Sequence, residues 1–200
     1  MYAMFGLVQP CFAQKNHHVE QSRHINPYRY VHRKENMNIL LRKSQYSDLS
    51  FLNEMLYEGV FWRASADKPS FEQGLAFPGV SKALADWGKR EGDVAVVALV
   101  DSIPAGAAWY RFWTDDNFIR GHIEENTPTL VIAVHRDYRR QGIGKKMIEW
   151  LIDHASKHSI QKISLMVSKD NYAINLYRQC GFVEYADKGD SLLMLREIKT

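Results

Sequence analysis

The stretch from Val131 to Lys146 constrains the fold more than any other part of the chain, because three kinds of local structure follow one another in it. An apolar, β-rich run ends at Val134, and a short polar turn carrying Gly142 follows. Apolar residues then recur at helical spacing, at Ile143, Met147, Leu151 and Ala155, with Ile148 and Ile152 beside them. The sequence therefore predicts a strand, a tight turn and an amphipathic helix in direct succession.

The predicted turn has the chemistry of an anion site. The first turn of a helix leaves backbone N–H groups unpaired and carries about half a positive charge, so a phosphate is stabilised there. Gly142 and Gly144 lack a Cβ atom and let the backbone approach phosphate oxygens. The surrounding cations are Arg136, Arg139, Arg140, Lys145 and Lys146. Glycines that only make a turn beside a solvated basic face are the alternative, but this many cations favours a pyrophosphate site.

The turn matches neither the dinucleotide fingerprint, because position 147 is Met, nor a P-loop. Arg139-Arg140-Gln141-Gly142-Ile143-Gly144 instead resembles the (Q/R)-x-x-G-x-(G/A) motif of the GNAT family of N-acetyltransferases. It departs from the commonest form at Arg136 and Arg140, where proline and glycine are frequent, and neither change removes a backbone donor. The resemblance implies acetyl-CoA as co-substrate, with its pyrophosphate on this loop and its pantetheine arm along the preceding strand. The cofactor-binding residues implied are Ile132, Ala133, Val134, Arg139, Arg140, Gln141, Gly142, Ile143, Gly144, Lys145, Asn171 and Tyr177.

The segment from Asn171 to Phe182 resembles the family's second landmark, N-x-A-x-x-L-Y-x-x-x-G-F. Its residues alone predict a helix that starts at an N-cap, Asp170 or Asn171, and stops at Gly181. The buried stripe expected of it consists of Ala173, Leu176 and Cys180, so the thiol is interpreted as packing rather than as a nucleophile. Tyr177 by itself is typical of a core edge. The resemblance gives it the role of general acid toward the thiolate of coenzyme A.

The reaction that the resemblance implies is direct attack of a neutral amine on the acetyl thioester. The developing oxyanion is expected to meet the main-chain N–H of Val134. The general base is expected among Glu124 and Glu125, with His122 and His135 as further candidates, since Pro128 stands near the place of a family glutamate.

The remaining periodicity predicts an α+β layout. Strands are expected at 38–43, 93–101, 105–113, 129–134, 162–168, 182–186 and 192–198, with a hairpin turn at 102–104. Helices are expected at 47–60, 80–90, 143–155 and 171–180. With the resemblance, the fold class is mixed α/β: a GNAT-like, central mixed, mostly antiparallel sheet flanked by helices.

Length and charge predict one domain over residues 38–198. Residues 1–36 lack any period and are expected to be a disordered extension, with Met37 as a candidate biological start. The formal net charge of +3 resides in that extension, so the domain is neutral and no nucleic-acid partner is expected. Four of the eight histidines fall there without a ligand spacing, and no metal site is expected.

The expected compartment is the cytoplasm. The chain has only two cysteines, Cys11 and Cys180, which argues against a disulfide framework. No apolar stretch approaches the roughly 20 residues of a membrane span, and the apolar start lacks a positively charged lead. No membrane partner is expected, and association into a homodimer is left open.

The expected function is acetyl transfer from acetyl-CoA to a primary amine of a small molecule or peptide. The alternatives are a protein acetyltransferase acting on lysine or an N-terminus, and a non-catalytic acyl-CoA-binding module. The acceptor is expected to contact the segment 61–79, the strand 109–113 and the loop 114–127. The acidic residues of that loop favour a cationic amine; they are Asp115, Asp116, Glu124 and Glu125.

Overall fold

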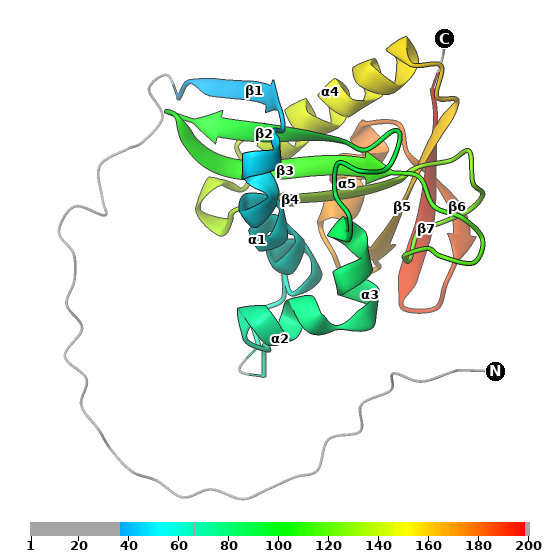
Figure 1. Cartoon of the computed structure of the whole chain (residues 1–200), viewed down its shortest axis with the longest axis horizontal. Helices are drawn as coiled ribbons and strands as arrows, with labels where there is room; N and C mark the ends of the chain where they lie inside the picture. The colour runs from blue at the N-terminus through cyan, green and yellow to red at the C-terminus, as the bar shows by residue number, and fades with distance from the viewer. Residues whose placement is uncertain (1–36, 66, 199–200) are drawn as a thin grey trace, which may run out of the picture. The chain divides into compact units, whose positions relative to one another are not determined.

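A computed structural model describes residues 37–65 and 67–198, and in this part of the chain one seven-stranded sheet forms the centre of the fold (Figure 1). Its strand order is β1-β2-β3-β4-β5-β7-β6, and every neighbouring pair is antiparallel except β4 with β5. The strands are β1 Ile39–Lys43, β2 Val94–Val100, β3 Ile103–Arg111, β4 Thr129–Val134, β5 Lys162–Ser168, β6 Val183–Asp187 and β7 Ser191–Glu197. The predicted mixed, mostly antiparallel sheet is confirmed. The predictions for residues 1–36 lie outside the described residues.

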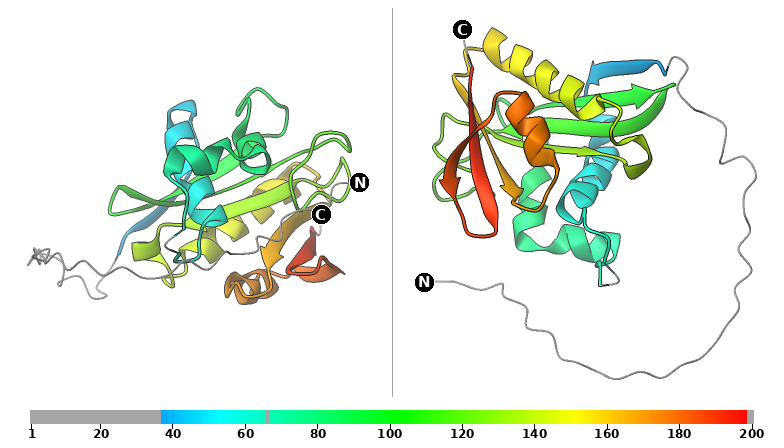
Figure 2. Two further views of the ribbon diagram at one scale, coloured as in Figure 1. Left: turned by 90° about the horizontal axis from the view of Figure 1, so that it is seen from below. Right: turned by 180° about the vertical axis from the view of Figure 1, so that it is seen from behind.

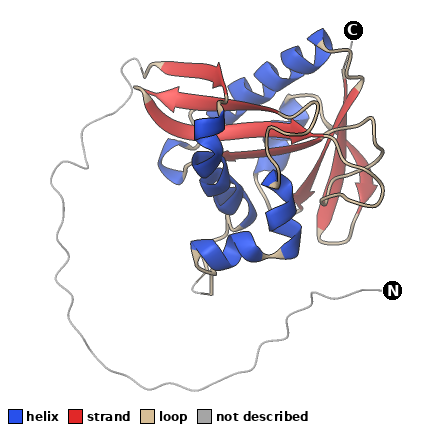
Figure 3. Ribbon diagram, viewed as in Figure 1, coloured by secondary structure: helices blue, strands red, loops and turns tan. Residues whose placement is uncertain are grey.

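Helices cover both faces of the sheet, as predicted (Figure 3). The α-helices are α1 Leu49–Val60, α2 Phe71–Ala76, α3 Pro78–Ser81, α4 Ile143–Lys157 and α5 Ala173–Gln179. Short 3-10 turns are η2 Tyr46–Asp48, η3 Lys82–Leu84 and η4 Arg136–Tyr138. Seen along the sheet, α1 to α3 lie on one side and α4 and α5 on the other (Figure 2).

The central strands are apolar on both sides because each side is covered. Val94 and Val96 of β2 pack in the cluster that contains α4, whereas Ala95 between them packs in the cluster that contains α1. The predicted stripe of α4 is buried, at Ile143, Met147, Ile148, Leu151 and Ala155. On α1 the buried residues are Leu52, Met55 and Leu56, while Val60, expected on the buried face, is 43% exposed.

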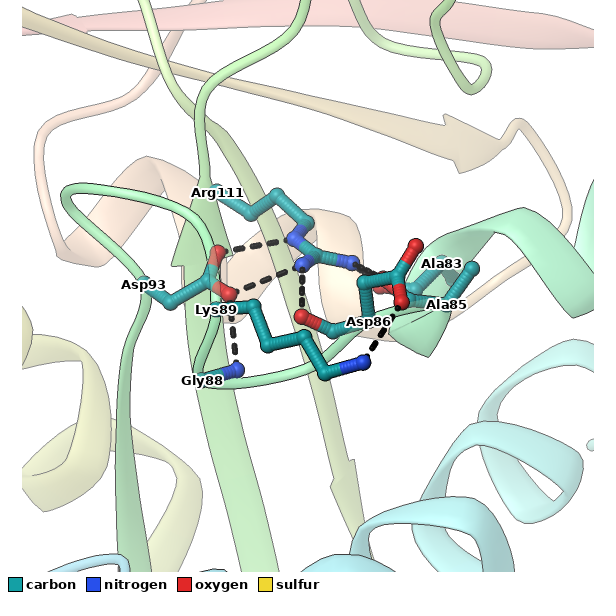
Figure 4. Close-up of polar contacts among 7 residues, drawn as sticks. All are labelled: Ala83, Ala85, Asp86, Gly88, Lys89, Asp93 and Arg111. Atoms are coloured by element: carbon teal, nitrogen blue, oxygen red, sulfur yellow. Dashed lines mark hydrogen bonds and ion pairs between the residues drawn. The ribbon is translucent and has the colours of Figure 1, made fainter.

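The helix predicted at 80–90 is wrong. Instead, α3 ends at Ser81, η3 follows it to Leu84, and the chain turns at Asp86, where φ is 54°. The cause is Arg111 of β3, whose buried guanidinium donates to the carbonyl oxygens of Ala83, Ala85 and Asp86 at 3.3, 2.7 and 3.4 Å (Figure 4). Because those carbonyls turn toward Arg111, they are not available for a continuing helix.

The hairpin between β2 and β3 is tighter than predicted. Its turn is Asp101-Ser102, with φ of 49° and 71°. Positive φ at both central residues is typical of a two-residue hairpin loop, whose twist matches that of the flanking strands. Ile103 and Pro104, expected in the turn, belong to β3. Pro104 is tolerated because the register of the pairing shifts opposite it, between Ala98 and Leu99.

Candidate active site

Strands β4 and β5 pair at a single point and then diverge. Thr129 lies opposite Ser164, and the Ser164 N–H donates to the Pro128 carbonyl at 3.0 Å. Beyond this point a cavity of about 1100 Å³ is lined by Leu130 to Val134 of β4 and by Leu165 to Ser168 of β5. The divergence therefore leaves one edge of β4 without a neighbouring strand along the cavity.

The free edge of β4 presents main-chain donors. The His135 N–H donates to the Ala105 carbonyl at 2.8 Å, so alternate residues, Ala133 among them, direct their N–H groups to β3. The N–H groups of Ile132 and Val134 consequently point to the side of β5. Arg139 reaches the Val134 carbonyl from that same side, with Nε at 2.9 Å. The Val134 N–H has the direction that an oxyanion contact requires, and its role stays a prediction.

The N-terminus of α4 opens onto the same cavity. The first helical hydrogen bond runs from Lys146 N–H to the Gly142 carbonyl at 3.1 Å, so the N–H groups of Ile143, Gly144 and Lys145 have no acceptor within the helix. Gly142 has a φ of 79°, and a Cβ there would meet nothing within 4 Å, so the glycine is needed for its backbone angle. At Gly144 a Cβ would lie 3.0 Å from Leu176 Cδ2, so the glycine lets Leu176 of α5 pack closely against the start of α4.

Three of the five predicted cations line the cavity and fall into two groups, whereas Arg136 and Lys146 do not line it. Arg139 is held in place, because besides Val134 it contacts Glu58 of α1, with Nη2 to Oε2 at 3.3 Å. Arg140 is exposed, with its guanidinium carbon 5.9 Å from the centroid of the Tyr172 ring. Lys145 is also exposed, 3.7 Å from Glu149. The last two are accessible to a phosphate.

The structure brings most of the expected cofactor residues to this cavity. Those that line it are Ile132, Ala133, Val134, Arg139, Arg140, Gly142, Ile143, Gly144, Lys145, Asn171 and Tyr177. Gln141 does not line it, because its side chain folds back toward the preceding turn, with Nε2 3.5 Å from the Asp137 carbonyl and a buried Oε1.

Tyr177 is buried but lines the cavity. Its ring packs edge-on against Phe182, with centroids 6.1 Å apart. A phenol is protonated at neutral pH, and burial, with smaller contributions from Tyr172 and Cys180, raises the pKa of this hydroxyl further above the ordinary value. A protonated phenol at the cavity wall can donate a proton.

Helix α5 differs in detail from the prediction. The Asn171 side chain fixes its start by accepting from the Ala173 N–H at 2.9 Å. The buried stripe consists of Ile174, Tyr177 and Cys180. Ala173 and Leu176, expected in that stripe, are half-buried and line the cavity instead. Cys180 is buried as predicted, and burial raises the pKa of its thiol.

The carboxylates predicted as general base are not at the cavity. Glu124 is exposed and lies 3.2 Å from Lys162, at the start of β5 and away from the divergence, and this hydrogen bond lowers its pKa. Glu125 is exposed and does not line the cavity either. His122 contacts Asp115 at 2.9 Å, and neither it nor His135 lines the cavity.

Two carboxylates that sequence reasoning missed do line the cavity. Glu58 of α1 lies 3.5 Å from Lys68 as well as close to Arg139. Asp190, just before β7, lies 3.4 Å from Arg120. No signal in the sequence marks either one, because a charged residue on an exposed helix face or in a turn is usually only solvated.

The cavity reaches both faces of the sheet. On the side of α4 and α5 it is lined by the loop before α4, at Arg139 and Arg140, by the start of α4, and by residues that pack with the α4 cluster, such as Leu176. On the opposite side it is lined by residues of the α1 cluster, such as Leu56 and Ala83, and by Phe118 to Arg120. The cavity is therefore large enough and open enough for two molecules to enter it from opposite faces of the sheet.

Within the described residues, no helix is long and apolar enough to cross a membrane. The same residues include no group of three His, Cys, Asp or Glu side chains placed to hold a metal ion.

Comparison with known proteins gives a family model that covers most of the residues lining the cavity. The model described as the acetyltransferase (GNAT) family matches residues 60–182. Among curated proteins, the [ribosomal protein bS18]-alanine N-acetyltransferase of Escherichia coli strain K12 is 44% identical over 54 residues. That match covers 26% of this chain and only 36% of the relative's length.

Solved structures share the fold at low identity. A GNAT superfamily phosphinothricin acetyltransferase from Sinorhizobium meliloti, in complex with acetyl-CoA, aligns with a TM-score of 0.60 and 19% identity over 81% of this chain and 89% of the other. The ribosomal-protein-S18-alanine N-acetyltransferase from Escherichia coli aligns with a TM-score of 0.53 and 23% identity over 82% and 96%.

Proposed function

This chain belongs to the acetyltransferase (GNAT) family, and from that premise we propose that it transfers an acetyl group from acetyl-CoA to a primary amine by direct attack. The observation that carries the proposal is the opening between β4 and β5, where a helix N-terminus and free main-chain donors meet in one cavity.

The residues present fit the donor. The free N–H groups at the start of α4 suit a pyrophosphate, and Arg140 and Lys145 add charge at the surface. The edge of β4 at Ile132 and Val134 suits an extended amide chain, which would add to the strand as a peptide does. Acetyl-CoA supplies the activated acetyl group and a thiolate leaving group.

The chain's own residues then have three tasks. The cavity holds the two reactants together, which removes much of the entropic barrier. The Val134 N–H stabilises the negative charge that develops on the acetyl oxygen when the amine nitrogen bonds to the carbonyl carbon. Tyr177 gives its hydroxyl proton to the sulfur as the carbon–sulfur bond breaks, and it regains through solvent the proton that the attacking nitrogen loses as the amide forms.

The amine must be neutral to attack. The carboxylates that line the cavity are poor acceptors for the proton of its ammonium form. The pKa of Asp190 is lowered by its hydrogen bond with Ser191 and by Arg120, and Glu58 is occupied by Lys68 and Arg139. We therefore assign the loss of the ammonium proton to water. The value of kcat/KM should then rise with pH and level off above the pKa of the acceptor amine.

The acceptor is proposed to be a small molecule or a peptide amine. The partial match to an alanine N-acetyltransferase of a ribosomal protein supports the peptide N-terminus as one class to assay. The cytoplasm is the proposed location, in keeping with a free, buried Cys180.

The proposal is tested by incubating the protein with acetyl-CoA and a panel of primary amines and measuring the release of the thiol of coenzyme A. Replacing Tyr177 with Phe should lower kcat about 10²- to 10⁴-fold while the Kd of acetyl-CoA stays unchanged. Replacing Tyr185, which is exposed on β6 and outside the cavity lining, is the matched control and should leave kcat unchanged. Full turnover by Tyr177→Phe would exclude the proton donor, and binding without turnover of any amine would favour the non-catalytic module.

A further inference from the structure

Outside the loop at the start of α4, the cavity lining carries more positive than negative charge. Lys82 and Arg120 line it next to Ala83 and Ile119, which pack in the α1 cluster; Arg63 lines it as well, and Asp190 is a carboxylate of the same lining. The further carboxylate, Glu58, is already matched by two cations, Lys68 and Arg139. Because the phosphates of the proposed donor have Arg140 and Lys145 as cations of their own, this excess is available to the second reactant.

The two arginines are held by exposed ion pairs and by one further contact each: Arg120 donates to Ser191 Oγ at 3.1 Å, and the guanidinium carbon of Arg63 lies 4.7 Å from the centroid of the Trp62 ring. Arg63 lies 2.6 Å from Asp170, and both side chains are more than half exposed. Arg120 lies 3.4 Å from Asp190, with side-chain exposures of 68% and 82%. Exposed pairs of this kind contribute little to stability, so an anion entering the cavity can replace either aspartate at low cost.

Lys82 forms no ion pair with any described residue, yet its backbone is fixed. It begins η3, and the carbonyl of the next residue, Ala83, accepts a hydrogen bond from the buried Arg111 at 3.3 Å. A cation on a fixed segment at the cavity wall is placed to bind an anion. Trp62 and Phe118 add aromatic surface to the lining of the same cavity.

We propose that the acceptor carries an anionic group, most simply a carboxylate, close to its amine, and that Lys82 binds this group together with Arg63 or Arg120. The inference rests on the proposed acetyl transfer and specifies its acceptor. It reverses the expectation of a cationic acceptor, because the acidic residues on which that expectation rested do not line the cavity; they are Asp115, Asp116, Glu124 and Glu125.

Matched acceptors test the proposal. Free amino acids are compared with their amides, and short peptides with an acidic second residue are compared with peptides with a neutral one. The carboxylate member of a pair should have the higher kcat/KM by about tenfold or more, the effect of one charge-assisted hydrogen bond. The first comparison identifies a free amino acid as the source of the carboxylate, and the second identifies a peptide.

The variant Lys82→Gln should bring that ratio close to one without changing the Kd of acetyl-CoA. Lys157→Gln, at the end of α4 and outside the cavity lining, is the control and should keep the wild-type ratio. Equal or better use of the neutral acceptors, or an unchanged ratio in Lys82→Gln, Arg63→Gln and Arg120→Gln, would overturn the inference. Failure to bind acetyl-CoA in a titration would instead refute the proposed function itself.

Discussion

Replacing Arg111 with methionine should destabilise the protein by about 3–5 kcal/mol, because it leaves the carboxylate of Asp93 buried without its cation. The two side chains are 1% and 3% exposed and form a two-pronged contact at 2.8 Å (Figure 4). For a chain of this size the melting temperature should fall by about 6–20 °C.

A double variant separates the charge from the other contacts of Arg111. Adding Asp93→Leu removes the unpaired carboxylate and should recover part of the loss, since an apolar pair can replace a buried ion pair. Recovery should stop short of the wild type. The carbonyls of Ala83, Ala85 and Asp86 still lack their donor, at a cost of about 1–3 kcal/mol for each one left buried.

The measurement is equilibrium urea unfolding of the single and double variants, with Lys157→Met as control. That substitution breaks an exposed pair with Asp153 and should cost less than about 1 kcal/mol. The reasoning is refuted if Arg111→Met unfolds at the midpoint of the control, or if the double variant recovers fully. Since Ala83 lines the cavity, partial loosening should also raise the KM of the acceptor and leave acetyl-CoA binding intact.

Two further changes follow from local geometry. Gly142→Ala forces a side chain to a φ of 79° and should cost about 1 kcal/mol and weaken acetyl-CoA binding, measured by unfolding and titration. Burial, then the charge of His158, lowers the pKa of His154 from 6.5, so the unfolded state binds its proton first and stability should fall as the pH drops below 6.5. His154→Gln should reduce that fall in the urea midpoint; an equal fall would contradict it.

The sequence by itself determined the phosphate-loop end of the candidate site. The strand, turn and helix of 131–146 and the helix that carries Tyr177 depend on periodicity and on backbone sterics within a few residues. The apolar runs likewise gave the order of strands and helices along the chain. Predictions of single elements were wrong where residues distant in the chain make contact. The helix predicted at 80–90 does not form because Arg111, 28 residues beyond Ala83, donates hydrogen bonds to the carbonyl oxygens of that segment.

Only the tertiary structure decided which charged residues line the rest of the cavity. Glu124 and Glu125 lie in a loop anchored to the start of β5, whereas Glu58, Lys82 and Asp190 reach the cavity from three segments far apart in the chain. Their meeting depends on which strands pair and where β4 and β5 separate. Those features arise from the packing of the whole sheet, and no local pattern of residues encodes them.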